Sequence, residues 1–166
     1  PAAVHPESHV EIGTPPTTDL TSFAISPDGE KVAYVALSDG QPQLWLRLLT
    51  TGVARPLGGT EGASHPFWSP DSKSIGFFTS EKLFRLDIDG GAPRPIVSAA
   101  VGTGGSWNRD GVILFAPVAD APVVRVSADG GDATLLPGAS RASGGQRFPH
   151  FLPDGRHFIY YVAESR

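Results

Sequence analysis

The residues that could do chemistry in this chain are few, and their spacing does not form a catalytic set. The sequence has no cysteine, which excludes a thiol nucleophile, a disulfide and a cysteine-ligated metal. Ser64 lies beside His65, but a nucleophilic triad depends on a spatial arrangement that adjacency in sequence does not supply. The histidines are not gathered in one motif: they are His5, His9, His65, His150 and His157. We expect no catalytic residue, no metal and no cofactor.

Four aspartates recur in similar short phrases, "ISPDG", "WSPDS", "NRDG" and "LPDG". A catalytic role would need these carboxylates to converge, whereas a repeated unit spreads them around one rim. Proline presets a turn, Asp bonds its own downstream backbone, and Gly adopts a positive φ. "DIDGG" at 87–91 begins like an EF-hand loop but lacks the later Glu. We therefore interpret the repeated positions as structural turn residues: Asp28, Gly29, Asp71, Asp110, Gly111, Asp154 and Gly155.

The spacing of these turns indicates the elements that must carry them. The four aspartates are 43, 39 and 44 residues apart, and a period near 40 with strand-like content is typical of a propeller blade. Each full unit contains four strand-like segments, and no segment shows a sustained helical period. The second segment, as in "VILFA" at 112–116, is almost wholly apolar, which suits a strand covered on both faces. The sequence predicts an all-β fold, a β-propeller of four-stranded antiparallel blades.

The blades do not add up to a closed ring. Units at 23–60, 61–100 and 101–140 are full, 141–166 holds only two strands, and 9–13 resembles an outer strand that completes another blade. A ring needs about four to eight blades. We expect about three and a half blades in one propeller region spanning 1–166. Because these blades do not close a ring, we expect either a piece of a longer propeller or self-association of two chains. The chain starts at Pro1 and has no Met, so we expect it to be a mature or excised piece.

Composition narrows the class of partner. The formal net charge is −4 and the basic residues are scattered singly, which argues against a nucleic-acid partner. The longest apolar stretch, 111–126, is interrupted by Asp120 and two prolines, so we expect no membrane insertion of this segment. Hydrophobic residues make up 40% of the chain, enough for a core, and we expect Trp45, Trp68 and Trp107 to belong to it.

The sequence that does not repeat is where we expect binding. In a blade, the turns after the first and third strands lie on one face of the disc, and the remaining loops lie on the other, which we call the loop face. The turns are explained by folding, whereas function often sits on loops. The candidate ligand-binding residues are His65, Arg141, Arg147 and His150. The alternative is that they are ordinary solvated loop residues.

The phrases "ISPDG", "WSPDS" and "LPDG" resemble the PD40 repeat, the WD40-like propeller unit of the bacterial TolB family. The longer phrases "PFWSPDSKSIGFF", "GGSWNRDGVILFAP" and "RFPHFLPDGRHFIYYV" are more similar to the C-terminal propeller of bacterial serine/threonine protein kinases. The third unit departs from the pattern, with Asn108 and Arg109 in place of Ser-Pro. The resemblance covers about 9–163, and no kinase catalytic motif is present.

The resemblance implies a non-catalytic propeller scaffold in a larger bacterial protein. Its role would be a sensor or interaction module, located outside the cytoplasm or in the periplasm, that binds a protein, peptide or small ligand at the loop face. Propellers also accompany prolyl-oligopeptidase-like hydrolases, so the alternative is an accessory domain of such an enzyme.

Overall fold

The computed structural model describes residues 11–17, 19–118, 120–136 and 145–163, and these residues contain strands, turns and loops but no helix. The first sheet contains β1 (Phe23–Ile25), β2 (Lys31–Ser38), β3 (Gln41–Leu48) and β4 (Ala54–Pro56). The second contains β5 (Ser64–Trp68), β6 (Ser74–Phe78), β7 (Lys82–Asp87) and β8 (Arg94–Ser98). The third contains β9 (Gly105–Trp107), β10 (Val112–Phe115), β11 (Val124–Ser127) and β12 (Thr134–Leu135). The fourth contains β13 (Gly145–Phe151) and β14 (Phe158–Ala163).

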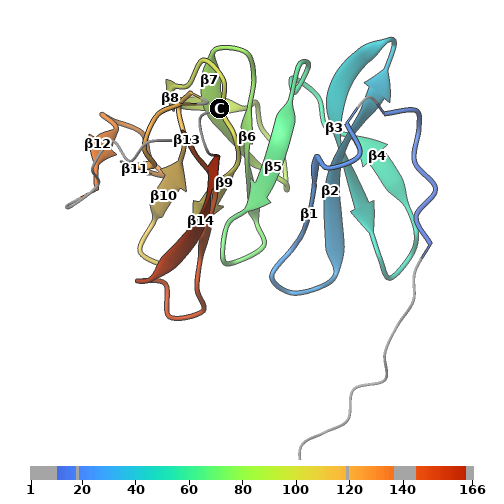
Figure 1. Cartoon of the computed structure of the whole chain (residues 1–166). Helices are drawn as coiled ribbons and strands as arrows, with labels where there is room; N and C mark the ends of the chain where they lie inside the picture. The colour runs from blue at the N-terminus through green and yellow to red at the C-terminus, as the bar shows by residue number, and fades with distance from the viewer. Residues whose placement is uncertain (1–10, 18, 119, 137–144, 164–166) are drawn as a thin grey trace, which may run out of the picture.

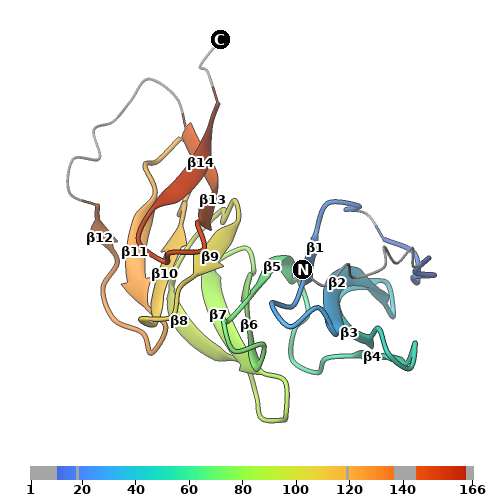
Figure 2. The same ribbon diagram turned by 90° about the horizontal axis from the view of Figure 1, so that it is seen from below.

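Each sheet is an antiparallel meander in which neighbours in sequence are neighbours in space. The four sheets stand side by side around an open arc, with the first strands β1, β5, β9 and β13 toward its inner side (Figures 1 and 2). This arrangement confirms the expected all-β partial propeller. Within the described residues, no helix is long and apolar enough to cross a membrane.

The core lies between neighbouring sheets. On β6, Phe77 packs into a cluster shared with the first sheet, and Phe78 packs into a cluster shared with the third. Every residue of β6 is buried, as expected for a middle strand covered on both faces. Trp68 belongs to the core at 6% exposure, whereas Trp45 and Trp107 are only half-buried at its margin.

The N-terminal segment covers part of the free face of the first sheet, over β2. Ile12 packs against a cluster that includes Val32 and Tyr34, and the Leu37 N–H donates to the carbonyl of Pro16 at 2.7 Å. The described part of the expected outer strand at 9–13, residues 11–13, lies in no strand, and residues 9 and 10 lie outside the described residues. Whether this segment completes another blade stays a prediction.

The fourth sheet differs from the others because only two of its strands lie within the described residues. On β14, Ile159 and Tyr161 are 59% and 60% exposed, whereas the equivalent β6 is fully buried. At the opposite end of the arc, Phe23 and Ile25 of β1 are exposed as well. Both ends of the described propeller therefore present apolar surface.

Candidate binding site at the loop face

Hydrogen bonds between loops divide the molecule into the two expected faces. On the loop face, the Gly62 N–H donates to the carbonyl of Pro42 at 2.7 Å. On the opposite face, which we call the turn face, the Leu49 N–H donates to the carbonyl of Glu30 at 2.8 Å. Figure 1 shows the turns that follow β1, β5 and β13 together at the lower edge. A residue's place in the repeat therefore tells which face it occupies.

Three of the four turn aspartates accept hydrogen bonds within their own turns, as their place in the repeat predicts. The Asp28 carboxylate accepts from the Glu30 N–H and pairs with Lys31 at 2.6 Å, and these bonds, with one from Ser26, hold its pKa well below the usual range. In the second turn, Asp71 accepts from the Ser69 hydroxyl and the Lys73 N–H, which lowers its pKa.

The fourth turn follows the same plan. The Asp154 carboxylate binds the His157 ring and accepts the backbone N–H groups of His157 and Arg156, and these bonds lower its pKa. The glycines of the turns, Gly29, Gly111 and Gly155, all have positive φ. Ser72 takes that conformation in the second turn, with a φ of 59°.

The third turn uses a different residue. The Asp110 side chain makes no hydrogen bond within the described residues, whereas Asn108 Oδ1 accepts from the N–H groups of Asp110 and Val112. Asn108 Nδ2 also donates to the carbonyl of Gly155 at 2.9 Å and so links this turn to the next. The departure from Ser-Pro-Asp-Gly therefore moves the structural role from Asp110 to Asn108.

In three of the four sheets, the chain at the loop-face end of the first strand has an unusual backbone conformation. Six residues before the turn aspartates stand Ser22, His65, Gly104 and Phe148, and the last three have φ values of 46°, 83° and 51°. His65 and Phe148 each precede a proline, which disfavours helical backbone, and the strands are irregular at both places. Strained residues of this kind concentrate at functional sites.

These conformations bring together rings from the second and fourth sheets. The rings of His65 and Phe148 have centroids 5.8 Å apart and are tilted by 48°. Phe148 lies directly over Gly104 of the third sheet, since a Cβ at Gly104 would lie 2.8 Å from Phe148 Cδ1. The absence of a side chain at Gly104 therefore allows His65 and Phe148 to meet. We call His65, Thr103, Arg147 and Phe148 the mouth cluster.

Polar atoms in the mouth cluster are buried without partners. Nδ1 of His65, Oγ1 of Thr103 and Nε of Arg147 are inaccessible to solvent and make no hydrogen bond within the described residues. Burial lowers the pKa of His65, which the Asp19 carboxylate opposes, so the imidazole is mainly neutral at pH 7. A buried polar group without a partner is costly, so the fold carries an unfavourable free energy at this cluster.

The four candidate residues from the sequence have different outcomes. His65 lies in the mouth cluster against Phe148, and Arg147 precedes Phe148 on β13. His150 is exposed on β13, opposite Ile159 of β14, and no hydrogen bond or ring contact joins it to His65 within the described residues. Arg141 lies outside the described residues. Phe148, Gly104 and Thr103 were not among the residues predicted to bind a ligand. Aligning the repeats by their turn aspartates nevertheless gives Phe148 the same position in its repeat as His65.

The mouth cluster has no features of a metal site. Within the described residues, no three His, Asp or Glu side chains gather closely enough to hold a metal ion. The groups it offers are a neutral imidazole, a guanidinium, a hydroxyl and an apolar ring. Such a set of groups can bind a ligand with a polar backbone and can contact an apolar side chain beside that backbone.

Comparison with known proteins identifies the fold but no family. No family model and no curated protein matches the sequence. Among solved structures, the chain is similar to a putative TolB from Agrobacterium tumefaciens, with a TM-score of 0.73, 24% identity, and coverage of 87% of this chain and 55% of that one. TolB from Acinetobacter baumannii gives a TM-score of 0.69 and 21% identity, covering 87% of this chain and 38% of that one.

A third neighbour is the β-propeller domain of the Trilobed protease from Pyrococcus furiosus, described as having an open velcro topology. Its TM-score is 0.53 at 19% identity, with coverage of 82% of this chain and 52% of that one. The chain thus spans about half or less of the length of these similar structures. At these identities the likeness establishes a TolB-like propeller fold.

Proposed function

We propose that this chain is a non-catalytic propeller segment of a larger bacterial protein, and that it binds an extended peptide segment of a partner at the mouth cluster. The observation that carries the proposal is the contact of His65 with Phe148, together with buried polar atoms on His65, Thr103 and Arg147 that have no partner within the described residues. A peptide backbone offers both donors and acceptors at close spacing, and one apolar side chain of the peptide would pack on the exposed ring of Phe148.

The parent protein that fits this role best is a receptor-type serine/threonine kinase with its sensor propeller outside the cytoplasm. The support is the similarity of the repeat phrases to kinase-linked propellers and the TolB-like fold. In this arrangement the propeller binds the partner, and the catalytic step belongs to another domain.

The ends of the arc fit a segment that is completed by other propeller sequence. Ile159 and Tyr161 on β14, and Phe23 and Ile25 on β1, are exposed at positions where a neighbouring blade would bury them. We infer that a second copy of this chain or further blades of the same ring cover these surfaces.

A peptide selection tests the mouth cluster. Random peptides displayed on phage are selected on the immobilised chain, and the selected peptides are synthesised and measured by calorimetry. Arg147→Gln and Phe148→Ser are expected to weaken binding by about tenfold or more. Arg156→Gln is the matched control, because Arg156 lies in the same sheet on the turn face. Peptides that lose affinity with Arg156→Gln but not with the mouth variants would contradict the proposal.

A second candidate function is an accessory domain of a prolyl-oligopeptidase-like hydrolase. The similarity to the propeller domain of a protease favours it. The sequence of the parent protein separates the two candidates. A kinase domain with a membrane helix supports the sensor, whereas a domain with a Gly-x-Ser-x-Gly nucleophile motif supports the hydrolase.

A further inference from the structure

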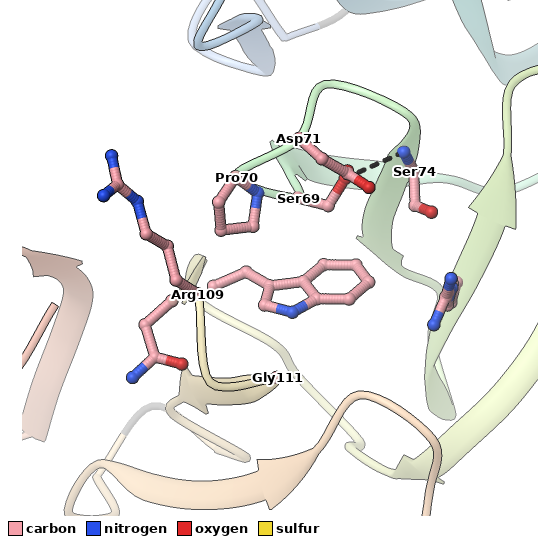
Figure 3. Close-up of a pocket in the computed structure, with 9 residues that line it drawn as sticks. Ser69, Pro70, Asp71, Ser74, Arg109 and Gly111 are labelled. Carbon is pink, nitrogen blue, oxygen red and sulfur yellow. Dashed lines mark hydrogen bonds between the residues drawn. The ribbon is translucent and has the colours of Figure 1, made fainter.

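A concave site lies on the turn face, between the turns of the second and third sheets. It has a volume of about 350 Å³ and is lined by residues that include Pro70, Asp71, Arg85, Trp107, Arg109 and Gly111. Figure 3 shows Pro70 and Asp71 on one side, Gly111 on the other, and Arg109 at the rim. We call it the turn-face cleft. It is separate from the mouth cluster, which lies at the other end of the first strands.

The cleft exists because one junction between turns lacks a bridge that the other junctions have. Between the first two turns, the Asp28 N–H donates to the Ser72 hydroxyl at 3.1 Å. Between the last two, Asn108 bridges to Gly155. At the middle junction Gly111 takes the place of Ser72, and no hydrogen bond joins residues 69–74 to residues 108–111.

Trp107 forms the wall of the cleft and differs from its counterpart Trp68. Trp68 is buried, and its indole N–H donates to the carbonyl of Ala24 at 3.0 Å. Trp107 is half-buried, and its indole N–H makes no hydrogen bond within the described residues. The guanidinium carbon of Arg85 lies 5.1 Å from the centre of the Trp107 ring, so the guanidinium supports the indole.

Within the described residues, one cation and one anion that line the cleft, Arg109 and Asp71, have no ion-pair partner. Arg85 pairs with Asp87 at 3.1 Å and with Asp129 at 3.5 Å. The Asp71 carboxylate accepts bonds from the Ser69 hydroxyl and the Lys73 N–H. Arg109 is exposed and has no carboxylate partner within the described residues. The cleft therefore offers a free guanidinium and a free indole N–H, both donors, beside the flat surfaces of Trp107 and Pro70.

We propose that the turn-face cleft binds a carboxylate carried on a flat apolar group, with Arg109 and the Trp107 indole N–H as donors to the carboxylate and with the flat group against the indole and Pro70. A guanidinium is the side chain best suited to a carboxylate, and flat groups stack favourably on indole. The ligand is either a small aromatic acid or the carboxyl end of a peptide with a terminal aromatic residue, since both present this chemistry.

Nuclear magnetic resonance of the ¹⁵N-labelled chain tests the cleft, because the three tryptophan indole N–H groups report separately. Benzoate and acetyl-glycyl-phenylalanine are titrated, each beside its neutral amide. The Trp107 indole signal is expected to shift and saturate with at least one acid and with neither amide, while those of Trp45 and Trp68 stay in place. Saturation by benzoate alone would identify small aromatic acids, and saturation by the peptide would identify chain ends.

Three variants test whether the shift of the Trp107 indole signal reports binding in the turn-face cleft. Arg109→Gln removes the charge from an exposed side chain and is expected to weaken binding roughly tenfold. Gly111→Ser restores the residue type of Ser72 and is expected to close the cleft and abolish binding. Gly29→Ser is the control, because Gly29 has the same positive φ of 73° and lines no part of the cleft. No shift at Trp107, equal shifts with the amides, or unchanged binding in Arg109→Gln would overturn the proposal.

Discussion

Gly104 shows how a single residue shapes the mouth cluster. Its φ is 83°, and an added Cβ would lie 2.8 Å from Phe148 Cδ1 and 3.2 Å from Phe148 Cα. Gly104→Ala therefore combines backbone strain with a clash, and we expect it to lower the free energy of unfolding by about 2 kcal/mol or more. Urea unfolding followed by tryptophan fluorescence measures the change.

Gly29→Ala is the matched variant for that measurement. Gly29 has a φ of 73°, but nothing lies within 4 Å of an added Cβ. We expect backbone strain alone, at a cost of about 1 kcal/mol. Equal costs for the two variants would mean that Phe148 does not lie over Gly104 in solution.

The pKa of His65 gives the stability a pH dependence. Because burial lowers the pKa of His65 in the folded state, the folded chain binds fewer protons than the unfolded chain near this pH. The contribution of neutral His65 to the free energy of unfolding is therefore fully present above the ordinary histidine pKa. We expect stability to fall as the pH drops from about 6.5 toward the lowered pKa, and His65→Asn to flatten this slope. Urea midpoints across this range test it, and an unchanged slope in His65→Asn would contradict it.

At the scale of the turns, the side-chain hydrogen bonds that hold each turn differ from one repeat to the next. Asn108 is buried and makes three hydrogen bonds, whereas the Asp110 side chain makes none within the described residues. We expect Asn108→Ala to cost about 1–3 kcal/mol and Asp110→Ala to cost less than about 0.5 kcal/mol. Thermal and urea unfolding of both variants measure the difference, and a larger loss in Asp110→Ala would contradict it.

The same scale shows what the sequence could predict. The spacing of Asp28, Asp71, Asp110 and Asp154 was enough to predict where each sheet lies along the sequence, because turn chemistry and strand composition are local properties. The role of Asn108 was missed, since it depends on which side chain reaches the next turn. Phe148 was missed because its contact with His65 joins positions 83 residues apart in the sequence and depends on the open space over Gly104.

At the scale of the whole molecule, the described chain is an arc with two unlike ends. At one end, residues from Ile12 onward pack on the first sheet. At the other, β14 pairs only with β13 among the described strands and exposes the side chains of Ile159 and Tyr161. A free strand edge flanked by apolar side chains favours pairing with another strand. Further blades or a second copy would bury both.

Light scattering coupled to size-exclusion chromatography tests most directly whether this chain is a propeller segment that needs a partner. The chain has a mass of 17.4 kDa. We expect a larger mass that decreases on dilution, and we expect Ile159→Lys combined with Tyr161→Lys to reduce it. A concentration-independent mass of 17.4 kDa together with a sharp thermal unfolding transition would contradict this account.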